Sequence, residues 1–234
     1  MLDKQIKNIP KKVIWCKNCC ISNQRPRIIF GKNQICSACQ YANYKNTINW
    51  KKREDELLRL LDRHRSKNSK WDVIVPSSGG KDSGFVAHQL KYKYGMNPIT
   101  ITWSPLQYTE IGKYNFDSLI NSGISNFLYT PNGKLQKKLA RLCFEELGDA
   151  FHVFVLGQVN FPFHMALKLD ISLVFYGENG ELEYAGDPKF KDRPFKPMSE
   201  WTNQHFKGVK FTDLINYGLK NKKYLSRNDL IDGD

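Results

Sequence analysis

One short stretch, VPSSGGKDSG at 75–84, combines small, basic and acidic residues in an order that is unusual for an ordinary turn. It follows an apolar run at 72–75 and precedes a run whose apolar residues recur at helical spacing. Gly79 and Gly80 allow the backbone to approach a ligand closely, and the free N–H groups at a helix start attract anions. Residues 78–83 are therefore predicted to bind phosphate.

The other residues of this stretch indicate a nucleotide bound together with a metal ion. Lys81 adds a positive charge, whereas Asp82 fits beside phosphate only if Mg²⁺ bridges the two or if it orients a backbone amide. Ser83 lies at the start of the predicted helix, where the helix dipole favours phosphate, and Ser78 precedes the two glycines. The spacing is neither the Walker A pattern nor the dinucleotide fingerprint. A plain turn is the alternative interpretation.

Apolar runs of strand type alternate with amphipathic runs of helix type through the middle of the chain. The run at 151–156 fits either a strand or a buried helix. The order predicts an α/β domain of Rossmann-like type, with a doubly wound parallel sheet that binds ligands where its strands end. The expected strands are 72–75, 99–103, 126–129 and 171–176, and the expected helices are 83–94, 109–121, 134–147, 159–169 and 213–220.

Five of the six cysteines lie in the first 40 residues, and four of them form two C-x-x-C pairs. Each pair places two thiolates on one turn, and two such turns complete a tetrahedral site. The spacing predicts a small module built around a structural Zn²⁺, with reduced core cysteines as the alternative. Cys20 and Cys143 are left over and are expected to be ordinary thiols. The predicted metal ligands are Cys16, Cys19, Cys36 and Cys39.

The chain shows no sign of membrane insertion or secretion. It contains no run of about 18 apolar residues, which is the length that a membrane-spanning helix needs. The first residues, MLDKQIKNIPKK, have no apolar segment of the kind that a secretory signal contains. A cytoplasmic protein with reduced cysteines is expected.

The stretch at 78–83 resembles the SGGxDS signature of the PP-loop ATP pyrophosphatases, which follows a strand and precedes a helix. The resemblance implies a PP-loop, HUP-like fold and an enzyme that uses ATP with Mg²⁺. Such an enzyme adenylates a carbonyl oxygen and releases pyrophosphate, after which a nitrogen or sulfur nucleophile displaces AMP. It also implies that adenine stacks near the end of the second strand, here around Thr102 and Trp103.

A second resemblance covers nearly the whole chain and is to the N-acetyl sugar amidotransferases. The segments that carry it include WCKNCCISNQRP, ICSACQ, VPSSGGKDS, NPITITWSPLQYTEIGKYN and YGENGELEYAG. It implies conversion of a sugar acetamido group to an acetamidino group in bacterial surface-glycan synthesis, as in lipopolysaccharide O-antigen or pseudaminic and legionaminic acid. A partner glutaminase and a cyclase-like ammonia-channel subunit would supply ammonia. The residues implied in catalysis are Lys81, Asp82, Glu178, Asn179 and Glu183.

The cysteine spacing predicts a zinc module at 1–48, the apolar face of the following segment predicts a linker helix at 49–70, and the resemblance implies a PP-loop domain at 71–234. Members of the amidotransferase family usually continue further, so the chain is expected to be a short or truncated homologue. The carboxylates after the strand at 171–176 are expected to hold Mg²⁺, accept a proton from ammonia or bind sugar hydroxyls, with a solvated acidic loop as the alternative.

Positive charge is concentrated in the first part of the chain and keeps a second function open. Residues 1–70 hold 17 Lys or Arg and 5 Asp or Glu, whereas 71–234 hold 19 and 18. The excess indicates a solvated basic surface or a patch for RNA, a phosphorylated substrate or an acidic partner. A PP-loop enzyme of the tRNA 2-thiolation type is the alternative function, and a non-catalytic zinc-containing scaffold is the third.

Overall fold

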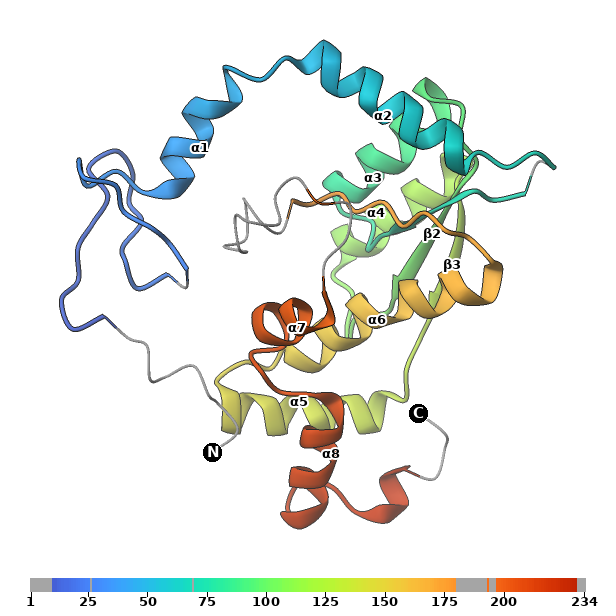
Figure 1. Cartoon of the computed structure of the whole chain (residues 1–234). Helices are drawn as coiled ribbons and strands as arrows, with labels where there is room; N and C mark the ends of the chain where they lie inside the picture. The colour runs from blue at the N-terminus through green and yellow to red at the C-terminus, as the bar shows by residue number, and fades with distance from the viewer. Residues whose placement is uncertain (1–9, 26, 69, 180–192, 194–196, 231–234) are drawn as a thin grey trace.

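The computed structural model describes residues 10–25, 27–68, 70–179, 193 and 197–230 (Figure 1). The chain forms a parallel sheet with helices on both of its faces, a second helical layer near the C-terminus and an N-terminal module that holds four cysteines. The α/β class predicted from the alternating pattern is confirmed. Within the described ranges, no helix has both the length and the apolarity that crossing a membrane requires.

Three parallel strands form the sheet in the order β1-β2-β3. The segment around Val174 lies on the other side of β1 and forms a single parallel bridge with Ile74. The strand expected at 171–176 is therefore present as an extended segment paired with β1, and β1 lies between two parallel neighbours. The strands span Val73–Pro76 (β1), Pro98–Trp103 (β2) and Ser125–Tyr129 (β3).

Three helices cover one face of the sheet. Leu61, Ala87 and Leu119, one from each helix, pack with Val73 and Val75 of β1 in one buried cluster. Thr109 caps the third helix, as its sequence predicts, by accepting a hydrogen bond from the Gly112 N–H. The helices are α2 (Trp50–His64), α3 (Lys81–His88), which continues as the π-helix η2 (Gln89–Lys93), and α4 (Glu110–Asn121).

Helix α6, His152–Leu169, covers the opposite face and resolves the ambiguous run at 151–156. That run is the first part of α6, which continues through Gly157 and Pro162. The helix packs against the sheet on one side and against α5 (Gly133–Leu147) on another, while Gln158, His164 and Lys168 are exposed to solvent. Residues 152–156 are all buried or half-buried and show no polar stripe, and for this reason periodicity could not distinguish this part of the helix from a strand.

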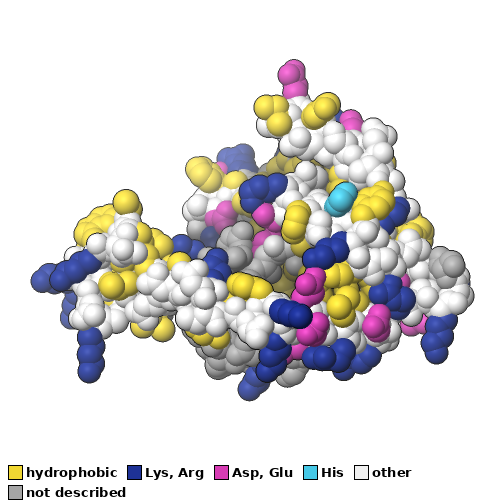
Figure 2. Space-filling model, turned by 90° about the horizontal axis from the view of Figure 1, so that it is seen from above, with side chains coloured by type: hydrophobic (Ala, Val, Ile, Leu, Met, Phe, Trp, Pro, Cys, Tyr) yellow, Lys and Arg dark blue, Asp and Glu magenta, His cyan; other side chains and the backbone are white. Residues whose placement is uncertain are grey.

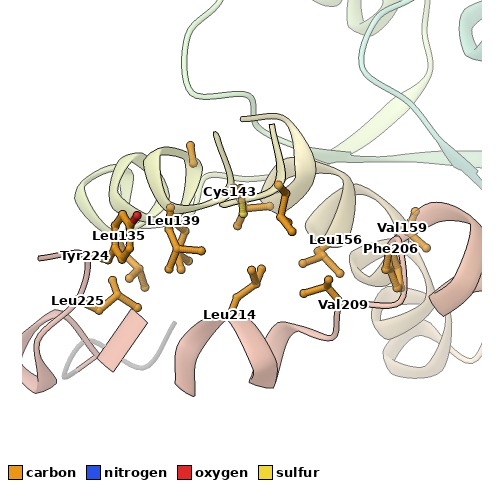
Figure 3. Close-up of a cluster of buried hydrophobic side chains, with 14 residues drawn as sticks. Leu135, Leu139, Cys143, Leu156, Val159, Phe206, Val209, Leu214, Tyr224 and Leu225 are labelled. Carbon is orange, nitrogen blue, oxygen red and sulfur yellow. The ribbon is translucent and has the colours of Figure 1, made fainter. Parts of the chain in front are cut away.

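The second helical layer has its own core, in which α5 and α6 pack against the C-terminal segments (Figure 3). Leu214 and Leu225 are fully buried there beneath Leu139 and Cys143. Burial raises the pKa of the Cys143 thiol to about 12, which fits the ordinary thiol expected at this position. The C-terminal elements are α7 (Met198–Glu200), η4 (Trp201–His205), α8 (Phe211–Lys220) and η5 (Arg227–Leu230).

The cysteine module projects from the rest of the molecule, and α1 (Ser37–Lys45) and α2 join it to the sheet (Figure 1). The view in Figure 2 shows Lys, Arg and hydrophobic side chains exposed on this lobe. A salt bridge of 3.3 Å between Arg27 and Glu200 links the module to α7. Helix α2 confirms the helix predicted in this region, whereas the division into domains stays a prediction.

A buried histidine beside the second core is expected to make the fold sensitive to acid. His152 is 1% exposed, and neither of its ring nitrogens has a hydrogen-bond partner among the described residues. Burial and the charge of Lys207 lower the pKa of His152, while Asp149 acts in the opposite direction. In the unfolded chain the His152 side chain takes up a proton near pH 6.5, whereas in the folded chain it does so only at lower pH. The stability that comes from burying the neutral histidine is therefore present above pH 6.5 and is lost as the pH falls below it.

We expect His152→Leu to flatten this dependence. The variant should show a higher melting temperature than the parent at acid pH and a smaller difference at neutral pH. Thermal unfolding measured between about pH 5 and 8 tests this, since that is the interval in which histidine changes its charge. If the melting temperatures of the parent and of His152→Leu changed with pH in the same way, His152 would not be the cause of the acid sensitivity.

Candidate functional site

Residues 77–83, which comprise the loop between β1 and α3 and the first residues of α3, are here called the glycine loop. Gly79 has a φ of 85°, and a Cβ atom at this position would lie 2.8 Å from the Cα of Phe116. Only glycine fits this conformation and this space. Gly80 occupies the N-cap position of α3 with extended backbone, so no side chain at the cap covers the first turn of the helix. The loop thus presents backbone N–H groups of a helix start, as its sequence predicts.

Two serine hydroxyls hold the glycine loop together from inside. The Oγ atoms of Ser77 and Ser83 lie 2.9 Å apart, and both side chains belong to buried residues. The Gly79 N–H donates to the Ser77 Oγ at 3.3 Å, and the Ser83 Oγ donates to the Gly80 carbonyl oxygen at 3.3 Å. Ser83 therefore stabilises the loop, while Ser78 is exposed.

The two charged residues of the loop pair with each other at its exposed side. The Lys81 Nζ donates to both carboxylate oxygens of Asp82, at 2.6 and 2.8 Å. Their side chains are 87% and 51% exposed. Exposed pairs of this kind contribute roughly 0–1 kcal/mol, so both groups can turn to a ligand at little cost.

The segment that follows the extended strand around Val174 reaches the same edge of the sheet as the glycine loop. A Cβ atom on Gly177 would lie 2.9 Å from the carbonyl carbon of Asp82 and 3.0 Å from the backbone nitrogen of Ser83. Glu178 and Asn179 follow directly and are exposed. The expectation that this stretch meets the loop is confirmed for Gly177. Glu183, which was also predicted, lies outside the described residues.

Replacement of Gly177 should push these two segments apart. We expect Gly177→Ala to lower the stability by roughly 1–3 kcal/mol, the usual cost of an overpacked contact, because the opposing atoms are backbone and cannot turn away. Gly133→Ala is the matched control, since nothing lies within 4 Å of a Cβ at that position. Thermal unfolding of both variants measures the difference, and equal melting temperatures would contradict the contact.

The residues predicted to lie near adenine are found at the end of β2. Thr102 is 1% exposed, and its hydroxyl donates to the Ser77 carbonyl oxygen at 2.7 Å. The Trp103 ring packs against Gly157, and a Cβ atom on Gly157 would lie 2.2 Å from the Cε2 atom of that ring. The centroid of the Trp103 ring is 5.0 Å from the centroid of the Tyr129 ring. Thr102 thus contacts the glycine loop directly, and the role of both residues in binding a nucleotide stays a prediction.

The four predicted metal ligands come together in the N-terminal module. The sulfur atoms of Cys16, Cys19, Cys36 and Cys39 all lie within 4.8 Å of one another. Their approach depends on local turns: the Cys16 N–H donates to the Ile21 carbonyl oxygen at 2.8 Å, and the Cys36 N–H donates to the Cys16 Sγ at 3.2 Å. The cluster is placed to hold a metal ion, and four sulfur ligands fit Zn²⁺.

The electrostatics of the cluster also fit a cation. Burial opposes ionisation of Cys16, but N–H groups of Cys36 and Asn18 outweigh it and lower the pKa of this thiol to about 6. At Cys19 the Ile21 N–H favours the thiolate, yet burial and the neighbouring cysteines raise the pKa to about 12. Four adjacent thiols cannot all ionise alone, whereas a bound divalent cation compensates their charges.

Sequence reasoning missed two residues that support the glycine loop. Ser77 precedes the recognised motif by one position, and Asn126 lies on β3 with its amide 2.8 Å from the Thr102 Oγ1. The strand sequence ITITW could have indicated these two residues. Alternation along a strand places Thr100 and Thr102 on one face of the sheet and the isoleucines on the other, so two polar side chains lie together on the first face. Polar residues on neighbouring strands are then the expected partners.

Comparison with known proteins gives little further guidance. No protein-family model matches the chain, and no curated protein matches it. A similar solved structure is described as a predicted subunit of tRNA methyltransferase from Methanocaldococcus jannaschii; it is 22% identical, and the match covers 63% of this chain and 74% of that chain. The TM-score is 0.35, which is too low for the likeness to support an argument about this chain.

Proposed function

We propose that the chain is an ATP-dependent N-acetyl sugar amidotransferase of the PP-loop type. In the proposed reaction the acetamido oxygen of the sugar bonds to the α-phosphorus of ATP as pyrophosphate leaves. Ammonia then adds to the activated carbon, AMP departs with the oxygen, and an acetamidino group remains. The ammonia would come from a partner glutaminase through a cyclase-like subunit, in the synthesis of bacterial surface glycans.

The observation that carries the proposal is the contact of Gly177 with the backbone of Asp82 and Ser83. Because of this contact, the two segments that resemble the amidotransferases, SGGKDS and GEN, meet at the carboxyl edge of one parallel sheet. In α/β proteins, ligands bind at this edge of the sheet. The binding position lies at the first strand, where neighbouring strands lie on both of its sides. The position of β1 between β2 and the Val174 segment is of this kind.

The roles proposed for the residues follow from their positions. The first-turn N–H groups of α3 and Lys81 would bind the phosphates, and Mg²⁺ held by Asp82 would offset their charge. Glu178 and Asn179 would bind sugar hydroxyls or accept a proton from ammonia, and Glu183 is proposed for the same group. The four cysteines would hold a structural Zn²⁺ without an open position for chemistry.

A PP-loop enzyme that modifies tRNA is the second candidate, and the basic charge of residues 1–70 favours it. The test measures pyrophosphate and AMP release with Mg-ATP and ammonium, and compares free and nucleotide-linked acetamido sugars with bulk tRNA. We expect release that requires a sugar and a product in which oxygen is replaced by NH. Release that requires tRNA instead, with salt-sensitive tRNA binding, would overturn the sugar proposal.

A further inference from the structure

We propose that Asn126 is a positioning residue for the glycine loop. Its side-chain amide orients the hydroxyl of Thr102, and this hydroxyl holds the carbonyl oxygen of Ser77, the first residue of the loop. The chain of hydrogen bonds runs from the third strand through the second to the point where the backbone leaves the first. The inference concerns the loop itself, and only its consequence for ATP binding rests on the proposed function.

The orientation of the Asn126 amide follows from its partners. The Thr102 Oγ1 donates its proton to the Ser77 carbonyl oxygen at 2.7 Å, and the Thr100 Oγ1 donates its proton to the Ser125 carbonyl oxygen at 2.9 Å. Each hydroxyl has one proton, so each can only accept from a third group. The Asn126 Nδ2 lies 2.8 Å from the Thr102 Oγ1, 2.9 Å from the Thr100 Oγ1 and 3.2 Å from the Thr100 carbonyl oxygen, so its two hydrogens are directed to Thr102 and to Thr100.

The register of the strands places this network next to the loop. Thr100 pairs with Asn126 across β2 and β3, so Thr102 lies one step further along the same face of the sheet. Ser77 follows β1 directly and is held by β2 through both backbone groups: its N–H donates to the Ile101 carbonyl oxygen at 2.9 Å and its carbonyl oxygen accepts from Thr102.

Fixing Ser77 also fixes the rest of the loop. The Ser77 Oγ accepts from the Gly79 N–H and lies 2.9 Å from the Ser83 Oγ at the start of α3. Thr102 and Thr100 are almost completely buried, and water therefore has little access to replace a lost partner. The amide of a residue two strands away thus determines how firmly the loop backbone is held.

The experiment compares two substitutions that break the chain of hydrogen bonds with two that leave it intact. Asn126→Asp replaces the donor by an acceptor of the same shape, and the Thr102 proton then turns to the carboxylate instead of the Ser77 carbonyl. Thr102→Val removes the hydroxyl. Thr100→Val is the matched control, because Thr100 bonds the same amide but its proton is directed to β3. Thr102→Ser restores the hydroxyl.

Hydrogen–deuterium exchange of the peptide 77–83 is the first readout. We expect exchange about fivefold faster in Asn126→Asp and Thr102→Val, the effect of one net hydrogen bond, and unchanged exchange in Thr100→Val and Thr102→Ser. Asn126→Ala replaces Asn126→Asp if the latter does not fold. Exchange that follows only the melting temperature, with Thr100→Val and Thr102→Val equal, would overturn the inference.

Binding of Mg-ATP is the second readout and separates this inference from the proposed function. If the parent binds Mg-ATP, the same two variants should show a Kd raised roughly fivefold, and Thr100→Val should bind as the parent does. If the parent does not bind Mg-ATP, the proposed function fails while the exchange measurement still decides the role of Asn126. A Kd that is equal in all variants of a binding parent would contradict the positioning role.

Discussion

Removal of a metal ion bound by the four-cysteine cluster is expected to unfold the N-terminal module and leave the sheet intact. Among the described residues between 10 and 48, the two buried ones are Cys16 and Cys36, which are themselves predicted ligands. Helix α1 buries none of its residues. A segment without an apolar core needs a disulfide or a bound metal ion to fold. Structural zinc in small modules binds with a free energy of roughly 10–16 kcal/mol, and this free energy stabilises the folded module.

We therefore expect the purified chain to carry one Zn²⁺ and Cys36→Ala to lose it. In that variant, limited proteolysis should cut within 10–48 while the remainder keeps the melting temperature of the parent. Cys20→Ala is the control, because this exposed cysteine is adjacent to a predicted ligand but lies outside the cluster. A Cys36→Ala protein with full zinc content, or with a module that resists protease as the parent does, would contradict the metal site.

Replacement of Asp82 is expected to cause the largest loss of activity. If Asp82 holds Mg²⁺ at the phosphates, Asp82→Ala should lower pyrophosphate release by roughly 10²–10³-fold, as does loss of a single group that stabilises charge in a transition state. The fold should persist, since the side chain is 51% exposed and pairs only weakly with Lys81. Steady-state pyrophosphate release and zinc content measure the two effects.

The control for this substitution is Asp117→Ala on α4. Asp117 is similarly exposed and also pairs with a lysine, Lys113, but it belongs to α4 and not to the glycine loop. We expect this variant to release pyrophosphate at the parental rate. Equal rates for Asp82→Ala and the parent would show that Asp82 is not part of the catalytic site. Loss of zinc in Asp82→Ala would contradict the view that the glycine loop and the cysteine cluster are independent sites.

The sequence predicted the sheet and its helices well where periodicity was clear. The runs at 99–103 and 134–147 each differ from an observed element, β2 or α5, by one residue at one end. In α6, the part at 159–169 was predicted as a helix, whereas the run at 151–156 fitted either a strand or a helix because residues 152–156 are buried or half-buried and show no polar stripe. Helix α1 was not predicted at all, since it has no buried face to produce a pattern.

The candidate site was predictable to the extent that its chemistry lies in local motifs. The cysteine spacing indicated the metal cluster, and the order of Ser and Gly in 78–83 indicated the loop at the start of α3. The support from Asn126 could not be predicted, because it depends on the register between β2 and β3, which no single segment contains. The contact of Gly177 with the loop was expected from the strand order, yet its closeness required the structure.

The most direct test of the proposed chemistry is the fate of the acetamido oxygen. An acetamido sugar labelled with ¹⁸O in its carbonyl group is incubated with the chain, Mg-ATP and ammonium, and the AMP formed is analysed by mass spectrometry. Attack of that oxygen on the α-phosphorus predicts that AMP acquires the label while the sugar gains nitrogen. AMP without the label, or AMP formed only when tRNA replaces the sugar, would contradict the account.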